Sequence, residues 1–479
     1  MSRHMPNTQA SLASSYRPDK ALWAFALASL SALSGIAFLP SAPNNSLTVI
    51  CRVVSVLAAV MLAINVRYSP RGIYSVSSVY LIVFSVFHFG LVVSFALDLV
   101  GLTSDFEEYI LTWFDTPATC RAVVLAGIAL ASLVAGKTLA ILYGVRLPTV
   151  SENDDAVRTM LGSAGAILLL ASTVAWFYVI VNLARIDLLG SYESFYTTVI
   201  DFNVAHIEAL INLGLVVTLL GPRSRLAVTA LLAVGGWAIA VMLIGHRGAI
   251  LFPLAGAIAV LGMKKIPVSP IKALVGAVVA LSLIAAIREL RETGLRDADH
   301  VSILASPVNG LMEMGGSLRP VREAALWIQQ GDEYSCGASF WAPFDRALYY
   351  VVPGWSRPPV ELDERLLANV VEQRVGSIGF SNVAESYYNF GPWGMALEFL
   401  AIGFLLGRMD FWPARPHLQT IVGVCLIPLL VHVRNTFTPV PAQIILGLVF
   451  INGLQFLIQL VCAPPDMVRA GRGTHFQFP

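Results

Sequence analysis

The chain has 479 residues, of which 56% are hydrophobic and only 13% are charged, and its mean hydropathy is +0.72. Because a soluble domain carries roughly 25% charged residues, this composition excludes an ordinary soluble protein and indicates an integral membrane protein. The formal net charge of +1 gives no reason to expect nucleic acid or a generally acidic partner. The five cysteines have no paired spacing, so neither a disulfide framework nor a metal site is predicted from them.

The first 20 residues are polar and basic, and the apolar run that follows has no clear cleavage site, which predicts a cytoplasmic tail and a retained first span. Runs of about 17 to 25 apolar residues can cross a bilayer as helices. Twelve such runs are predicted, at 21–40, 46–66, 74–97, 121–143, 160–183, 206–221, 226–244, 248–263, 271–287, 391–408, 418–433 and 442–462. The expected fold class is therefore all-α, a polytopic integral membrane protein of about twelve transmembrane helices.

The connectors between these runs predict the sidedness of the chain. With the N-terminus in the cytoplasm, every predicted inner connector carries arginine or lysine, as the positive-inside rule requires. The outer connector 41–45 is uncharged and the outer connector 98–119 is acidic. This topology places one large polar loop in the periplasm and both termini in the cytoplasm. The predicted divisions are a tail at 1–20, nine helices at 21–287, the periplasmic loop at 288–390, three helices at 391–462 and a tail at 463–479.

Helical periodicity recurs inside the large loop, over 309–330 and 362–375. Both stretches have polar faces, so they are expected to lie along the membrane surface. The asymmetry of the chain, with one loop of this size and no similar halves, favours an enzyme over a transporter built from inverted repeats.

Two arginines fall where the outer face of the membrane is expected. Arg247 lies in a minimal connector with the sequence Gly-His-Arg-Gly, and Arg434 follows the span that ends near residue 433. A charge at this depth is costly unless it is paired or faces a polar cavity, which makes both functional candidates. The alternative is that each side chain extends to the lipid headgroups. Guanidinium is well matched to phosphate because its planar fork binds two oxygens.

Further basic groups lie close to these positions. Arg288 and Arg291 begin the large loop, where phosphate binding and local ion pairs with the interleaved glutamates are equally plausible interpretations. His246 and His432 precede Arg247 and Arg434 by one and two positions, so each is either a proton-transfer group or a structural histidine at a helix end.

The loop closes with a motif rich in polar and aromatic residues, from Gly379 to Gly394. If this stretch is helical, Glu385 and Asn389 share a face and Tyr388 lies next to them. A carboxylate, an amide and a phenol at the membrane boundary are typical of a sugar site, in which hydroxyls need acceptors and rings cover apolar sugar surface. The alternative is an interfacial aromatic belt with an incidental acid.

In these motifs the chain resembles the bacterial polymerases of O-antigen and oligosaccharide repeat units. The resemblance rests on the Gly-His-Arg-Gly connector and on four further segments, which are Glu313–Arg319, Cys336–Phe340 with Tyr349–Pro353, Ala384–Gly391 and Arg434-Asn435. It covers most of the chain from the sixth span onward, while the first five spans match only in hydropathy. Arg365 and Gly376 also fit a pattern discussed for some relatives, in which ten residues separate an arginine from a glycine.

The resemblance implies a metal-independent glycosyltransferase of the GT-C-like membrane class without a cofactor. Its substrate would be an oligosaccharide on undecaprenyl pyrophosphate, and the growing glycan would be transferred to the non-reducing end of a new lipid-linked repeat at the periplasmic face of the bacterial inner membrane. The products would be O-antigen, capsule or exopolysaccharide. Membrane lipid is an expected partner, and a chain-length regulator and a flippase are candidate partners.

Residue roles follow from this reaction. Arg247 and Arg434 are assigned to the donor pyrophosphate, with Arg288, Arg291 and Arg319 as second candidates. Glu385 is expected to orient or deprotonate the acceptor hydroxyl, helped by Asn389 and Tyr388. Two rival functions stay open: a ligase that transfers finished glycan from the carrier, and a flippase or transporter of lipid-linked sugars.

Overall fold

The computed structural model describes residues 18–99, 112–143, 154–183, 204–244, 246, 248–264, 269–293, 307–376, 378–412 and 416–462. All regular secondary structure in these ranges is helical. The longer helices are α2 (Pro18–Phe38), α3 (Leu47–Arg67), α4 (Val76–Ala96), α6 (Pro117–Leu142), α7 (Asp154–Tyr178), α9 (Val204–Leu220), α10 (Arg225–Leu243), α11 (Gly248–Met263), α12 (Pro270–Thr293), α17 (Asn382–Asp410), α18 (Pro416–His432) and α19 (Val440–Cys462). The shorter ones are α13 (Pro307–Met314), α14 (Leu318–Gln329), α15 (Ala338–Leu348) and α16 (Leu367–Val375).

Each of the twelve apolar runs predicted from the sequence coincides with one of the longer helices. Eight helices in the described part of the chain are long and apolar enough to cross a membrane. The apolar helical stretches at 204–220, 248–263, 275–286 and 417–432 are shorter than 18 residues. The all-helical membrane fold is thus confirmed, while the twelve-span topology stays a prediction.

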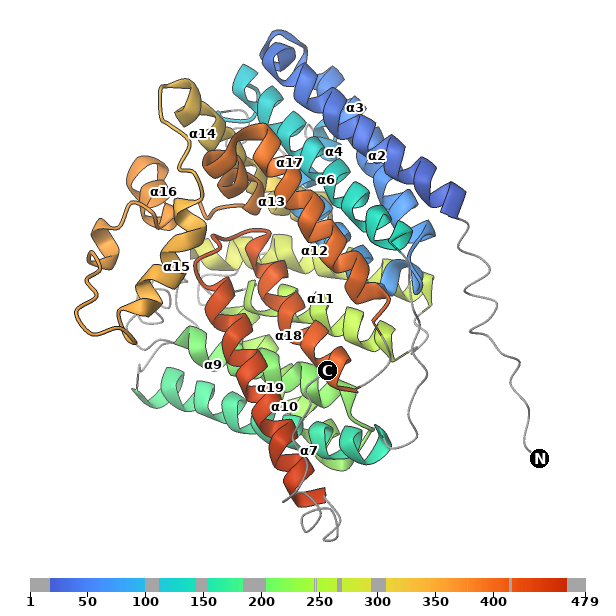
Figure 1. The fold of residues 1–479 in the computed structure, drawn as a ribbon, viewed down its shortest axis with the longest axis vertical. Coiled ribbons are helices and arrows are strands. Elements are labelled where there is room, and N and C mark those ends of the chain that lie inside the picture. Colours follow the sequence, from blue (N-terminus) through green and yellow to red (C-terminus); the bar gives the residue numbers. More distant parts are fainter. Residues whose placement is uncertain are drawn as a thin grey trace, which may run out of the picture.

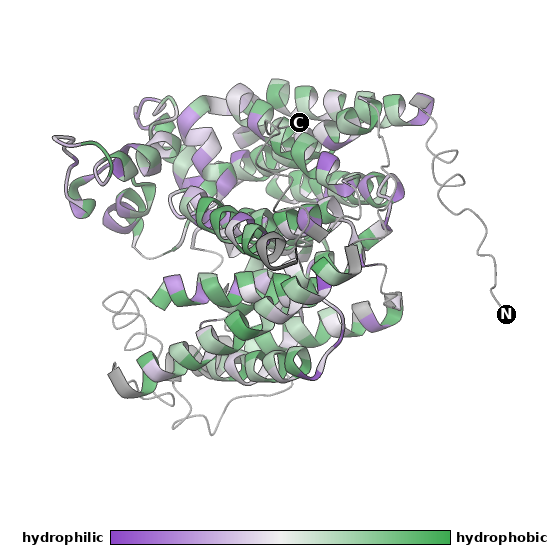
Figure 2. Cartoon of the chain, turned by 60° about the horizontal axis from the view of Figure 1, so that its bottom comes forward, coloured by the Kyte–Doolittle hydropathy of each residue, from purple (hydrophilic) through white to green (hydrophobic). Residues whose placement is uncertain are grey.

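The helices form two groups joined by a central layer (Figure 1). One group contains α2, α3, α4, α6 and α17, and the other contains α7, α9 and α10. Between them, α11 packs against α18, α9 and α4, while α18 packs against α19. Each group has its own apolar core. Figure 2 shows hydrophobic residues along the bundle, whereas the projecting part at the left, which holds α15 and α16 in Figure 1, is more mixed.

The first group is organised around α6. In the most apolar 18-residue stretch of this helix, 89% of the residues are buried inside the protein. Its closest neighbour is α17, and small residues allow their backbones to approach. A Cβ atom added at Gly136 would lie 1.9 Å from the Leu400 carbonyl oxygen, and one at Gly403 would lie 2.0 Å from the Leu133 carbonyl oxygen. Both helices therefore need glycine at their crossing, which fixes the position of α17.

A buried polar chain adds a second constraint on the same helices. Lys137 of α6 donates to the Asn65 carbonyl oxygen and to Ser69 Oγ. Ser69 contacts Ser77, which donates to the Asp410 carboxylate at the end of α17. Since all five residues are buried, a chain of hydrogen bonds joins α3, α4, α6 and α17 at the end of α17 opposite the projecting helices.

The helices of the polar interval differ from the expectation in their location. The predicted helix at 309–330 occurs as α13 and α14, and these pack against α4, α6, α12 and α17. A Cβ atom at Gly310 would lie 2.0 Å from the Leu281 carbonyl oxygen of α12, so this contact is backbone to backbone. The second predicted helix is shorter than expected and begins at Leu367. Tertiary packing, which local periodicity does not report, decides the location of α13 and α14.

The crossing of α6 and α17 gives a test of the fold. Gly403→Ala should lower the thermal stability of the purified protein, since the methyl group forces two helix backbones apart, and overpacking costs about 1–3 kcal/mol. Gly453→Ala in α19 is the matched control, because nothing lies within 4 Å of its added Cβ. The measurement is the unfolding temperature in detergent, and equal temperatures for the two variants would contradict the close approach.

Candidate active site

The site is built around the start of α17. Gly379 has φ +74°, a conformation that favours glycine, and it turns the chain into the helix. The next residue, Phe380, donates its backbone N–H to the Arg434 carbonyl oxygen at 3.3 Å. Ser381 is the N-cap and accepts from the backbone N–H groups of Val383 and Ala384. The closing motif therefore folds as a capped helix tied to the segment after α18.

His88 of α4 holds this cap from behind. Its Nδ1 lies 3.0 Å from the Phe84 carbonyl oxygen, which can only accept, so Nδ1 carries the proton of the neutral ring. Its Nε2 lies 2.9 Å from Ser381 Oγ and thus accepts the hydroxyl proton. Ser381 can then use its lone pairs for the helix N–H groups. His88 is fully buried, so this bond fixes the start of α17 against α4.

One turn into α17, the Glu385 carboxylate lies at the centre of a hydrogen-bond cluster. Ser339 Oγ of α15 donates to Oε1 at 2.6 Å. On the other side, Oε2 lies 3.2 Å from His432 Nε2 at the end of α18 and accepts the Phe437 backbone N–H at 2.6 Å. Glu385 has no exposed surface and His432 is 2% exposed. The carboxylate thus joins α15, α17 and the connector between α18 and α19.

The cluster decides which nitrogen of His432 is basic. A carboxylate oxygen that already accepts a backbone N–H favours a proton on the facing Nε2. In the neutral ring the lone pair is then on Nδ1. Phe340 and Phe437 border the imidazole, with ring centroids 6.4 Å and 5.5 Å from it. The arrangement is an oriented histidine in a largely apolar surrounding, which can act as a general base.

Asn389 completes the cluster one turn further along α17. Its Nδ2 donates to Ser339 Oγ and to the Glu385 carbonyl oxygen, both at 2.8 Å. The expectation that Glu385 and Asn389 share a helix face is confirmed. Tyr388 does not join them, because its hydroxyl donates to Asp332 at 3.0 Å and its ring meets Trp327. The predicted convergence of acid, amide and phenol therefore holds only for the acid and the amide.

Arg434 lies at the same end of the bundle. Its guanidinium carbon is 5.7 Å from the centre of the Phe87 ring of α4. That ring stacks on Phe252 of α11, with centroids 5.4 Å apart. Because α11 starts at Gly248, its first turns and Arg434 share Phe87 as a neighbour. Arg247, the residue before Gly248, lies outside the described residues.

His246 is held in a way similar to His432. Its Nε2 lies 3.8 Å from a carboxylate oxygen of Glu208 in α9, and the other oxygen of Glu208 accepts from Trp176 Nε1 at 3.3 Å. The structure does not bring His246 into the Glu385 cluster. Each of the two histidines has its own acidic partner: Glu208 of α9 for His246, and Glu385 of α17 for His432.

The remaining candidates take other positions. Arg319 lies at the start of α14, which packs against α6 and α17. Arg288 and Arg291 belong to the last turns of α12, and their side chains lie outside the described part of the structure. Arg365 binds Asp345 and Asp363 within the loop. None of these contacts connects them with Glu385.

Three polar partners, Ser339 of Glu385, His88 of Ser381 and Glu208 of His246, were not predicted from the sequence. Ser339 occurs in the Cys336–Phe340 segment, but nothing in that segment indicates a contact with a residue 46 positions away. His88 lies in the middle of an apolar helix, and Glu208 lies in a short one. A buried ionisable residue within an apolar run is the one signal that marks both.

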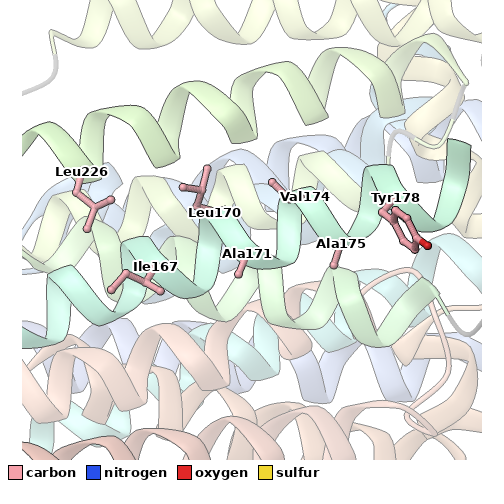
Figure 3. A pocket seen from close by; sticks show the side chains of 7 residues that line it. All are labelled: Ile167, Leu170, Ala171, Val174, Ala175, Tyr178 and Leu226. Carbon is pink, nitrogen blue, oxygen red and sulfur yellow. The ribbon is translucent and has the colours of Figure 1, made fainter. Parts of the chain in front are cut away.

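An apolar groove of about 600 Å³ lies elsewhere, on α7 and the start of α10 (Figure 3). Its lining residues are Ile167, Leu170, Ala171, Val174, Ala175, Tyr178 and Leu226. They offer one phenol and otherwise only apolar side chains. The groove is therefore suited to a hydrocarbon chain rather than to chemistry.

The N-cap of α17 gives a test of how the site is positioned. Ser381→Ala should cost about 0.5–2 kcal/mol of stability and should also lower activity, because Glu385 lies one turn after the cap. Ser224→Ala is the matched control, since Ser224 caps α10 through the Ala227 N–H. It should lower stability to a similar extent and retain activity. Equal activity of the two variants at a temperature where both are folded would contradict a role of the Ser381 cap in positioning the site.

Comparison with known proteins gives a family and one relative. The family described as O-antigen polysaccharide polymerase Wzy matches residues 22–462. Protein CapE of Staphylococcus aureus is 24% identical over 206 residues, which are 43% of this chain and 45% of CapE. The chain thus matches less than half the length of this relative. No solved structure matches the chain.

Proposed function

Because the chain belongs to the O-antigen polysaccharide polymerase Wzy family, we propose that it joins oligosaccharide repeat units carried on undecaprenyl pyrophosphate at the periplasmic face of the inner membrane. The family is one of membrane-embedded polysaccharide polymerases, and the apolar helices agree with it. The name of the relative CapE is consistent with a capsular or related product. The lipid carrier, the membrane side and the residue roles below are parts of this proposal.

The observation that carries the mechanism is the contact between Glu385 and His432. In the proposed step, a hydroxyl oxygen of the acceptor repeat attacks the anomeric carbon of the donor glycan. The bond from that carbon to the pyrophosphate oxygen breaks, and the hydroxyl proton passes to Nδ1 of His432. Since Glu385 has no exposed surface, it acts through His432 and holds the ring in the basic tautomer.

The leaving pyrophosphate gains negative charge as the bond breaks, and this charge needs a cation. We assign it to Arg434 and Arg247, a role that guanidinium fulfils without a metal ion. The contacts of Phe87 support this proposal. Its ring lies next to Arg434, and it stacks on Phe252 of α11, the helix that begins directly after Arg247. Arg288, Arg291 and Arg319 are second candidates for the same phosphates, and His246, Tyr388 and Asn389 are candidates for contacts with the sugars.

The pair of Glu385 and His432 is tested by non-additivity. His432→Ala should lower the rate of glycan extension by about 10²–10⁴-fold, the usual contribution of a general base, and Glu385→Gln should lower it less. The double variant should be no slower than His432→Ala alone, because the carboxylate acts through the ring. The assay follows extension of a purified lipid-linked repeat unit. Independent, multiplicative losses would contradict the proposed relation.

The donor site is tested by arginine substitution. Arg247→Ala and Arg434→Ala should yield folded protein that leaves single repeats unextended, and Arg434→Lys should also be impaired because an ammonium group lacks the planar fork. Arg225→Ala, at the exposed start of α10, is the control and should give a normal ladder. A normal ladder from Arg434→Ala would refute the assignment. Failure of the unsubstituted chain to extend single repeats would instead favour a ligase or a flippase.

A further inference from the structure

The helix that supplies Ser339 has two unlike faces. Ser339, Ala342 and Arg346 of α15 are buried at helical spacing. On the opposite face Trp341 is 60% exposed, and its ring lies 5.9 Å from that of Phe344, which is also exposed. An exposed apolar face of this kind normally marks a contact with another apolar phase.

The exposed apolar surface continues beyond the end of α15. Tyr349, Tyr350, Val351, Val352 and Trp355 are all exposed, and Val351 is 77% exposed. After a turn, Val360 and Leu362 are exposed as well. We call the exposed aromatic and aliphatic residues of 341–362 the loop patch, which consists of Trp341, Phe344, Tyr349, Tyr350, Val351, Val352, Trp355, Val360 and Leu362. Tryptophan, tyrosine and valine together are the residue types of the boundary between headgroups and acyl chains.

Two arginines and two aspartates of this loop are bonded to one another, whereas Glu361 and Glu364 are exposed. Arg346 donates to Asp363, and Arg365 binds both Asp363 and Asp345. Burial raises the pKa of Asp363, but hydrogen bonds and charge from Arg365 and Arg346 outweigh this effect and hold its pKa below the usual value. The carboxylate is therefore ionised at neutral pH, and the ion pairs fix the loop behind its apolar surface.

The Arg357 side chain is also held by contacts within the loop. Its guanidinium stacks at 4.5 Å and 4.7 Å from the ring centres of Tyr349 and Tyr350, and it donates to the Tyr350 hydroxyl at 2.9 Å. These contacts leave few free hydrogen-bonding groups beside the rings, whereas a sugar site needs such groups. The aliphatic residues Val351 and Leu362 likewise fit acyl chains better than sugar hydroxyls.

The loop patch lies next to exposed apolar residues of helices that are long and apolar enough to cross a membrane. Phe340 of α15 stacks on Phe390 at 5.6 Å and contacts Phe437 at 4.9 Å. Phe390 and Trp393 are exposed at the kink of α17, where Gly391 has φ +66°. In addition, α15 packs against α19, whose exposed face carries the apolar residues Ile445, Leu446 and Val449.

From this arrangement we infer that the loop patch docks on the bilayer surface, with its aromatic and aliphatic side chains in the interface between headgroups and acyl chains. The occupant is membrane lipid. The docking holds α15 at the level at which the spanning helices leave the membrane. The inference concerns location, so it does not depend on the catalytic roles proposed above.

The test measures the depth of a nitroxide label in the intact protein. The label is placed at Val351→Cys in a Cys336→Ser background, and mock-labelled Cys336→Ser protein corrects for the remaining cysteines. The matched control is Gln373→Cys, on the exposed polar side of α16. In nanodiscs of phosphatidylethanolamine and phosphatidylglycerol, collisions with oxygen report the acyl region, and collisions with a water-soluble nickel chelate report solvent.

The label at position 351 should show a ratio of oxygen to nickel collisions several-fold higher than the label at position 373. Equal ratios would overturn the inference. It would also be overturned by a label at 351 that is open to nickel and becomes shielded only when polysaccharide is added, since that result indicates a glycan surface. Neither result depends on whether the labelled protein extends glycans. A failure of the docking inference can therefore be distinguished from a failure of the proposed function.

Discussion

The Glu385 carboxylate is hydrogen-bonded by the Ser339 hydroxyl of α15 and by the His432 imidazole and the Phe437 backbone N–H from the end of α18 and the connector that follows it, and no part of the carboxylate reaches solvent. Taking a carboxylate out of water costs several kcal/mol unless its lone pairs are satisfied. The cost here is offset only while α15, the end of α18 and the connector after it keep their positions around Glu385. The same constraint that orients His432 therefore also holds together this end of the bundle.

The sequence predicted the elements of this fold much better than their contacts. The twelve apolar runs became helices because hydrophobic length is a local property. The shared face of Glu385 and Asn389 was also predictable, since it follows from four-residue spacing. The partners of Glu385 were not, because Ser339 and His432 lie 46 and 47 positions away. Their meeting depends on how α15 and α18 pack against α17.

Tyr388 shows the limit of reasoning from neighbours in sequence. It is adjacent to Asn389, but one residue of α-helix turns a side chain by about 100°. Its hydroxyl consequently meets Asp332 and its ring meets Trp327, so it does not reach Ser339. The location of α13 and α14 against the spanning helices was likewise hidden, because their polar faces are compatible with either a surface or a docked position.

The two histidines that precede the singled-out arginines share one physical arrangement. His432 faces Glu385 and His246 faces Glu208, and both acids are supplied by a different helix. An imidazole beside a carboxylate has its ring orientation fixed, and for His432 this restrains the end of α18, from which Arg434 follows. Arg434 follows within two residues of its restrained histidine, and Arg247 follows directly after its own. A cation placed in this way loses less conformational entropy when it binds an anion than one on a free loop. We therefore propose that Glu385, by restraining His432, preorganises Arg434 for the developing pyrophosphate charge.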